Sequence, residues 1–316
     1  MTRRIVLRVA ALVPILFVIS LLTFAIGKLT PGDPVGDTLR SQGLTPQQIA
    51  TVRAAYGLTL PLPEQYGHWL ASLFTSGGGQ SILLGQSVFS VLWPAFVNTL
   101  ILAAAALAFF LVVGVAIGVI AGLNHRKPVD RFLMLFVQLG SNLSVYWFGL
   151  VLIWLFALEW RILPAAGKTS VGGGTGSLLL HLVLPGFSAA IISTLIIARL
   201  VRAGVIEAMS SDYVRTYRSQ GLSLPAIIRR HVARNVAPVI VATTGLETGA
   251  LLSGVVFVEA VFDWPGIGTQ LANAIQGHDY PVIQGGVILV ATTFVVVNLV
   301  TDIIHDLLNP RLRGAG

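Results

Sequence analysis

The side chains best suited to specific binding lie in one short stretch, SDYVRTYRSQG at 211–221, between the apolar segments SAAIISTLIIARLV and VAPVIVATTGLETGALLSGVVFV. Tyr213 and Tyr217 are four residues apart and share one face of a helix, while Arg215 and Arg218 share another. Aromatic and arginine side chains dominate protein-binding surfaces. A basic loop at this place also binds anionic lipid head groups. The residues alone therefore leave two interpretations, a docking element for a soluble partner or a loop at the membrane surface.

The local pattern predicts how this stretch folds. Ser211 and Asp212 are suited to cap a short helix, and Asp212 also favours the positive end of its dipole. Gly221 provides a C-terminal stop. A second helix is expected to begin at Ser223–Pro225 and to continue through the basic run at 229–231. We therefore expect two short helices joined by a glycine hinge.

Catalytic signatures are missing. The GKT at 167–169 resembles the end of a phosphate-binding loop, but the leading glycine position is Ile162 and Pro164 interrupts the loop. The sequence contains no H-E-x-x-H zinc motif, no G-x-S-x-G nucleophile elbow and no cysteine. We expect neither an enzyme nor a resident cofactor or metal.

The elements that position these residues belong to a membrane protein. The chain has 316 residues, of which 55% are hydrophobic and 10% are charged, and its mean hydropathy is +0.83. Soluble domains carry about 25% charged residues, and about 20 consecutive apolar residues span a bilayer. The sequence holds several such runs and predicts an all-α polytopic membrane protein.

The apolar runs predict six transmembrane helices. They are expected at about 5–28, 94–123, 132–158, 182–206, 236–258 and 282–305. The first run is longer than the apolar region of a signal peptide and lacks a cleavage site, so we interpret 1–29 as a retained span. The segment 30–93 is expected to be extracytoplasmic, with a helix over Thr45–Ala55 capped by Thr45, and 94–313 holds the other five spans.

The basic residues orient the chain. With the N-terminus inside, fifteen of the twenty Lys and Arg residues fall on the cytoplasmic side. This bias places both termini in the cytoplasm by the positive-inside rule. Because the basic residues cluster at helix ends rather than on one exposed face, the high pI does not indicate nucleic-acid binding.

Several short motifs occur in a fixed order along the chain. They are Pro31-Gly32-Asp33-Pro34, Tyr56-Gly57-Leu58, Asp212-Tyr213-Val214-Arg215-Thr216 with Gly221-Leu222, Val258-Glu259 with Phe262 and Trp264-Pro265-Gly266, Asp279-Tyr280-Pro281, and Asn309-Pro310-Arg311. In this order and spacing the chain resembles the dipeptide/oligopeptide/nickel branch of ABC-importer permeases over nearly its whole length. Tyr217 departs from the small residue usual in that branch, and Asn309 stands for its Asp.

The resemblance implies a type I (MetI-like) permease core with an extra N-terminal span. It implies a coupling loop at about 207–235 that docks on two cytoplasmic ATPase subunits, which bind ATP and Mg²⁺. It also implies a sister permease and an extracytoplasmic substrate-binding protein, in a prokaryotic inner or plasma membrane. The coupling positions are Asp212, Tyr213, Val214, Arg215, Thr216, Tyr217, Arg218, Gly221, Leu222, His231, Arg234 and Asn235.

The imported solute would be a dipeptide or oligopeptide, with nickel or another small solute as the alternative. A secondary transporter should show inverted repeats and broken midplane helices, and neither is evident. A scaffold protein would not need the coupling pattern.

Polar residues inside the apolar segments are candidates for the solute pathway, because charges there are expensive. Glu247 lies near the middle of the fifth span. It is either protonated or paired with a hydroxyl such as Thr243 or Thr244, or it faces the cavity and binds a cationic group of the solute. Gln138 and Asn142 line the pathway or form helix–helix hydrogen bonds. The glycines at 114, 118 and 122 form a small-residue stripe for close helix packing.

Overall fold

The computed structural model describes residues 2–29, 36, 40, 43–55, 57 and 59–308. The motif at 31–34, the motif at 309–311, and Tyr56 and Leu58 lie outside the described residues. The chain forms two compact units, one from Met1–Thr99 and Pro265–Val296 and the other from Leu100–Trp264 and Val297–Gly316. The described part is helical, and its only β-pairing is an isolated bridge between Gln80 and Ser87.

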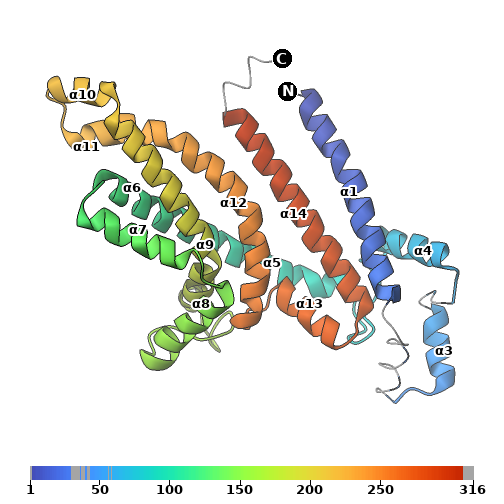
Figure 1. Ribbon diagram of the computed structural model, residues 1–316. Helices are drawn as coiled ribbons and strands as arrows, with labels where there is room; N and C mark the ends of the chain where they lie inside the picture. The colour runs from blue at the N-terminus through green and yellow to red at the C-terminus, as the bar shows by residue number, and fades with distance from the viewer. Residues whose placement is uncertain are drawn as a thin grey trace. The chain divides into compact units, whose positions relative to one another are not determined.

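Helices also make up the first unit (Figure 1). They are α1 (Thr2–Leu29), α3 (Pro46–Ala55), α4 (Leu62–Thr75), the first turns of α5 (Val88–Phe109), α13 (Ile267–Gln276) and most of α14 (Tyr280–Leu308). The start of α3 is as predicted: the Thr45 hydroxyl accepts a bond from the Gln48 backbone N–H at 3.4 Å, and the Gln48 side chain accepts one from the Thr45 N–H at 2.8 Å. This reciprocal pair is a capping box.

Helix α4 packs on α1 through aromatic side chains. Tyr66 contacts the rings of Phe17 and Phe24, and its hydroxyl lies 2.7 Å from the Ser20 hydroxyl. Trp69 continues this cluster against Phe24. These contacts anchor part of the segment expected outside the membrane to the first helix.

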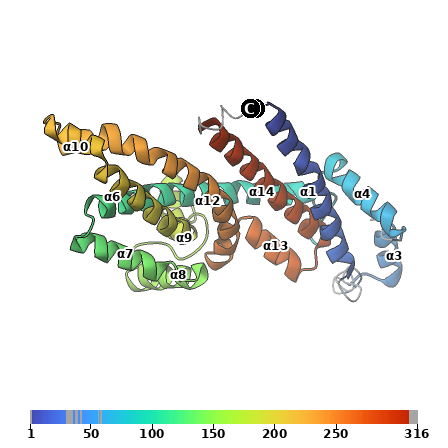
Figure 2. The same cartoon turned by 45° about the horizontal axis from the view of Figure 1, so that its top comes forward.

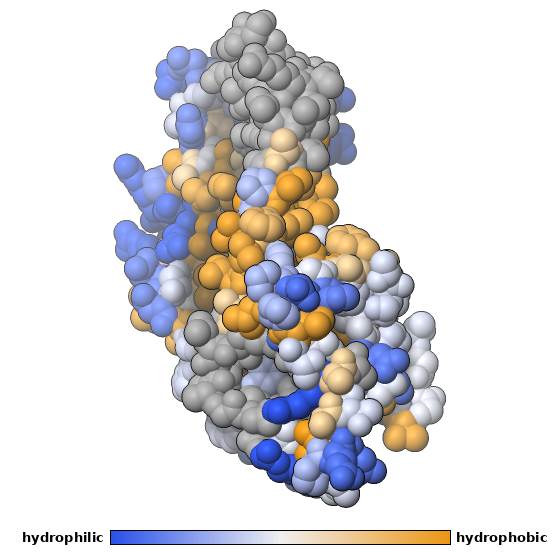
Figure 3. All heavy atoms as spheres, turned by 90° about the vertical axis from the view of Figure 1, so that its right-hand side faces the viewer, coloured by the Kyte–Doolittle hydropathy of each residue, from blue (hydrophilic) through white to orange (hydrophobic). Residues whose placement is uncertain are grey.

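Seen from the side of α1 and α4, hydrophobic side chains gather in the middle of the face, and hydrophilic ones are more frequent at its lower end (Figure 3).

A buried aspartate joins the loop before α5 to the turn before α14. Asp279 is 2% exposed, and its carboxylate accepts hydrogen bonds from the Ser81 hydroxyl and from the backbone N–H groups of Ile82 and Leu83. Each buried carboxylate oxygen therefore has a donor, as burial requires. The aspartate of the Asp279-Tyr280-Pro281 motif serves as a structural link in this unit.

The second unit is a bundle around one long helix. Its elements are the end of α5, the π-helical segment η1 (Phe110–Gly114), α6 (Val115–Leu123), α7 (Pro128–Gly140), α8 (Val145–Leu152), η2 (Ile153–Glu159), α9 (Thr175–Ser210), α10 (Asp212–Ser219), α11 (Leu224–Ile227), η3 (Ile228–Val232) and α12 (Ala233–Val261). Helix α9 lies between α12 and the α6–α7 pair, as both ribbon views show (Figures 1 and 2). Its buried residues run from His181 to Ala208, so the helix is buried along most of its length.

The glycine stripe packs as predicted. A Cβ atom on Gly114 would lie 2.9 Å from the carbonyl oxygen of Thr194, and one on Gly118 would lie 2.7 Å from that of Ala198. A Cβ atom on Gly122 would lie 2.7 Å from Cβ of Val205. Only glycine permits this approach, so η1 and α6 run along α9 nearly backbone to backbone.

The single helix expected over 132–158 is wrong. Helices α7 and α8 are bent by 112° across a break at 141–144. The Gly140-Ser141-Asn142 sequence ends α7. Ser144 then has an extended backbone, and α8 begins at the next residue. The pair is therefore a broken span or a re-entrant segment.

Other helices are long enough to cross a bilayer. Among the described residues they are Val88–Leu123, Thr175–Ser210, Leu224–Val261 and Tyr280–Thr301, and the α7–α8 pair adds a fifth if it counts as one crossing. In α1 the apolar stretch Leu12–Ala25 is shorter. The protein is thus multi-pass, and the sixth span remains a prediction.

The stripe can be tested by replacing a tightly packed glycine. We expect Gly118→Ala to destabilise the second unit by about 1–3 kcal/mol, because the added methyl group must displace α9 backbone and Val201. The measurement is the melting temperature of the purified protein in detergent.

The matched control is Gly254→Ala on α12, where an added Cβ has only the Ala189 carbonyl oxygen nearby, at 3.9 Å. This variant should melt at or above the parent temperature, since alanine favours the helix. Equal melting temperatures for the two variants would contradict the close packing of α6 on α9.

Candidate functional site

The loop between α9 and α12 begins with the short helix α10, at the place that the sequence predicts. Ser211 is the N-cap residue by its backbone conformation, but its side chain does not cap the helix. The Ser211 hydroxyl instead donates to the carbonyl of Ala208 at the end of α9. The predicted position of the cap is confirmed and the predicted side-chain bond is wrong, because the last carbonyls of α9 offer a nearer acceptor.

Gly221 ends α10 in the left-handed conformation, with φ +79°. Its N–H donates to the carbonyl of Arg218 at 3.0 Å, and the N–H of Leu222 donates to that of Tyr217 at 3.1 Å. This pair of bonds is a Schellman motif, which satisfies two carbonyls at the helix end. The glycine stop is confirmed.

The expected second short helix is instead the start of a longer one. Ser223 precedes α11 as its N-cap, as predicted, but the chain then continues through η3 into α12 without a break. The basic residues at 229–231 therefore lie on the first turns of the helix that carries Glu247. The loop therefore continues directly into that helix.

The two tyrosines of α10 face the rest of the loop. Their rings meet edge to face at 6.2 Å, and Tyr217 stacks on His231 with ring centroids 4.0 Å apart. The Tyr213 hydroxyl accepts a hydrogen bond from the Asn235 side chain at 2.6 Å. Tyr213, Tyr217 and Leu222 are partly buried against the core around Val214. These contacts hold α10 against η3 and the start of α12.

The charged side chains of the loop point outward. Asp212, Arg215, Thr216 and Arg218 on α10 are exposed, as are Arg229, Arg230 and Arg234 on the following helix. On α10 only Val214 is buried. The loop thus presents a basic surface, and its aromatic residues make the internal contacts.

Glu247 lies on α12 and bonds to a residue of α9. The Ser193 hydroxyl donates to its Oε2 at 2.6 Å, and the carboxylate is only partly buried. The two threonines considered as partners do not bond to it: Thr243 is buried, and the Thr244 hydroxyl donates to the Ile240 carbonyl. The sequence contains Ser193 in the apolar run of α9, but nothing in it indicates this pairing.

Gln138 and Asn142 lie together at the break between α7 and α8. The Asn142 side chain donates to the backbone carbonyl of Gln138 at 3.3 Å, and both residues are exposed. This bond is local to the end of α7. One expectation for Asn142 was a hydrogen bond to another helix. The bond that it forms is instead to the backbone of its own segment.

Two family models match the chain. The model described as "Binding-protein-dependent transport system inner membrane component" matches residues 114–314, and the N-terminal membrane-component model of such systems matches residues 1–110.

Relatives with similar sequences cover nearly the full length. The chain is 32% identical to the dipeptide transport system permease protein DppB of Escherichia coli, over 97% of both chains. It is 35% identical to the di/tripeptide transport system permease protein DppB of Pseudomonas aeruginosa, again over 97% of both. A probable peptide ABC transporter permease protein of Sinorhizobium fredii is 32% identical over the same share.

A substitution at Gly221 tests the backbone conformation alone, because no atom would lie within 4 Å of an added Cβ. Left-handed backbone costs an ordinary residue about 1–2 kcal/mol, while asparagine tolerates it better. We expect hydrogen exchange at the Leu222 amide to accelerate most in Gly221→Val, less in Gly221→Ala and least in Gly221→Asn.

Gly172 provides the control, since it has φ +73° and equally open space in a different loop. Gly172→Val should leave exchange in the 217–222 segment unchanged. If the three Gly221 variants exchange at the parent rate, the Schellman motif does not hold this loop.

Proposed function

This chain belongs to the family of inner membrane components of binding-protein-dependent transport systems, and we propose that it imports dipeptides or oligopeptides as a permease subunit driven by ATP. The observation that carries the proposal is similarity over 97% of both chains to permeases named for dipeptides and di/tripeptides. As a membrane permease, the chain is not itself the catalytic subunit. ATP and Mg²⁺ would be bound by two partner ATPases.

The proposed orientation has six spans and both termini in the cytoplasm. In the second unit, the basic turn at 124–127 lies beside the C-terminal part of α9, because Gly122 packs against Val205. The basic loop at 211–235 follows directly from the end of α9. Two basic segments at one end of the unit support a cytoplasmic position for that end.

The loop at 207–235 would couple ATP hydrolysis to the spans. Its exposed arginines would form ion pairs with the ATPase surface, since charge complementarity favours docking. Because α9 enters the loop and α12 leaves it, displacement of α10 would move both helices. Tyr213, Tyr217 and His231 would transmit the force by keeping α10 fixed to η3, and a sister permease would complete the pathway.

Glu247 is the proposed contact for the solute. Its carboxylate is partly exposed although it lies within an apolar helix, and a charge in a span is costly unless it is paired or faces water. The Ser193 bond occupies one oxygen. The amino terminus of a peptide is a suitable cation for the other.

Import is tested in proteoliposomes that contain this chain, its sister permease, both ATPases and the binding protein. We expect ATP-dependent uptake of a labelled dipeptide. Arg215→Glu should weaken binding of the ATPases roughly tenfold or more, because it reverses a charge in the proposed contact.

Arg161→Glu is the matched control, since Arg161 is exposed in the loop between η2 and α9 and should not touch the ATPases. Uptake of Ni²⁺ in place of the dipeptide would overturn the proposed solute. An Arg215→Glu complex with unchanged stoichiometry and salt resistance would show that this arginine contacts only lipid head groups.

Replacement of Glu247 tests the solute contact. We expect Glu247→Gln to leave assembly and basal ATP hydrolysis intact, and to reduce uptake of peptides with a free amino terminus roughly tenfold relative to acetylated analogues. The reason is loss of the counter-charge with nearly unchanged volume.

Ser193→Ala serves as the control, because it removes the hydrogen bond and keeps the carboxylate. This variant should retain the preference for free amino termini. Equal uptake of both peptide kinds by Glu247→Gln and the parent would mean that Glu247 is a structural hydrogen-bonding residue instead.

A further inference from the structure

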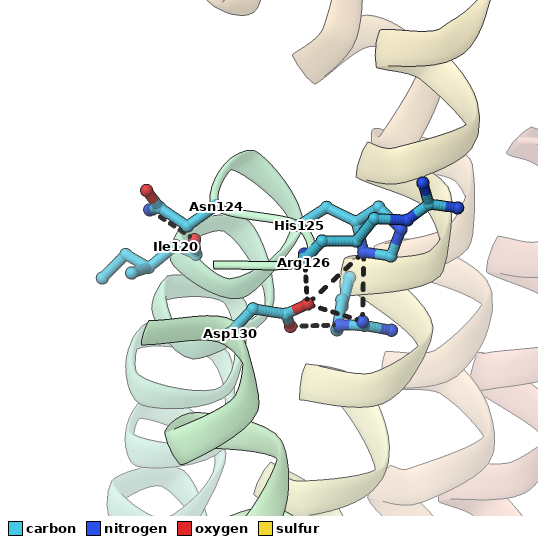
Figure 4. Close-up of polar contacts among 6 residues, drawn as sticks. Ile120, Asn124, His125, Arg126 and Asp130 are labelled. Atoms are coloured by element: carbon cyan, nitrogen blue, oxygen red, sulfur yellow. Dashed lines mark hydrogen bonds and ion pairs between the residues drawn. The ribbon is translucent and has the colours of Figure 1, made fainter. Parts of the chain in front are cut away.

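A second polar cluster lies at the turn between α6 and α7. The Asp130 carboxylate accepts two bonds from Arg202 on α9: Nε donates to Oδ1 at 2.6 Å and Nη2 donates to Oδ2 at 2.8 Å (Figure 4). Oδ2 also accepts the backbone N–H of Arg126 at 3.1 Å. His125 Nδ1 lies 3.3 Å from both Asp130 Oδ2 and Arg202 Nη2. We call these four residues the Asp130 joint.

The carboxylate at the centre of the joint is buried, and the geometry of its ion pair is specific. The Asp130 side chain is 4% exposed, and that of Arg202 is 25% exposed. Two parallel bonds from one guanidinium specify direction as well as distance. A buried ion pair is weak evidence for stability, but it is a good means of fixing one arrangement of the helices that it connects.

The turn itself is held by the same carboxylate. Arg126 has a left-handed backbone, with φ +67°, which aims its N–H at Asp130. Lys127 N–H donates to the Asn124 carbonyl at 2.9 Å and closes the turn. Asp130 thus connects α7, the turn and α9 at one point.

The joint lies beside the end of the glycine stripe that is nearer to the coupling loop. Gly118 and Gly122 bring α6 against α9 over the turns before and around Arg202. After Arg202 the helix continues only to Ser210, where it meets α10. A force that α10 applies to α9 therefore acts close to the Asp130 joint.

We propose that the Asp130 joint transmits the displacement of α10 to the α6–α7 hairpin, so that α6, α7 and α9 move as one body during transport. This inference rests on the proposed coupling function of the 207–235 loop. Asp130 and Arg202 are positioning residues, which touch neither the solute nor the nucleotide. Without the joint, α7 would be held to α9 only by apolar contacts such as that of Val137 with Leu195, and less of the displacement would reach it.

The first test measures the movement directly. Because the chain has no cysteine, two spin labels are introduced at Arg131→Cys on α7 and Ala203→Cys on α9, both at exposed positions. In the assembled transporter the distance between the labels should be the same in the ATP-free and ATP-bound states. In an Arg202→Gln background the distance should broaden or differ between the states. A parent distance that changes with ATP would overturn the proposal, whether or not the variant folds.

The second test measures coupling. Arg202→Gln should assemble with the ATPases and hydrolyse ATP, while the solute imported per ATP falls about fivefold or more. Arg202→Lys, which keeps the charge and loses the paired geometry, should be intermediate. The control is Arg199→Gln, an exposed arginine one turn earlier on α9, which should behave as the parent.

The outcomes separate the two proposals. If the parent complex imports no solute with ATP, the proposed function fails. If the parent imports solute and Arg202→Gln imports as much per ATP, only the joint is refuted.

Discussion

The close approach of α6 to α9 is the contact on which the second unit depends. Three glycines place the two backbones so near that an added methyl group would collide with α9 carbonyls or side chains. In a bilayer, lipid is as apolar as leucine, so tight packing of this kind rather than hydrophobicity brings helices together. With α6 fixed on one side of it and α12 on another, α9 becomes the buried axis of the unit.

The polar groups of the unit follow from that arrangement. A charged side chain on a helix surrounded by others is costly unless a neighbour offers a partner. Ser193 meets Glu247 of α12, and Arg202 meets Asp130 of α7. Ser193 and Arg202 both lie on α9, and apolar contacts set the position of that helix. The packing of α9 therefore decides which polar residues meet.

The loop at 207–235 joins this axis to the helix that carries Glu247. Its tyrosines are used for internal contacts with His231 and Asn235, which leaves the arginines as the outward-facing groups. The loop therefore connects α9 and α12 through internal aromatic and hydrogen-bond contacts, and its outer surface is basic. Such a connection fits the coupling role proposed for the loop.

Patterns local in the chain were readable from the sequence: the apolar runs, the glycine stripe, the capping box at Thr45, and the left-handed stop at Gly221. Each depends on the backbone preference or spacing of neighbouring residues. The family was indicated by short motifs that occur in a characteristic order along the sequence. The break at 141–144 was also marked, by Gly140-Ser141-Asn142, but the apolar residues around it concealed the signal. The tertiary structure alone decided that Ser193 meets Glu247, 54 positions away, that Arg202 meets Asp130, 72 positions away, and that the tyrosines of α10 face inward. Those pairings depend on which turns of neighbouring helices lie beside each other once α9 is packed. The types of the side chains do not determine that alignment.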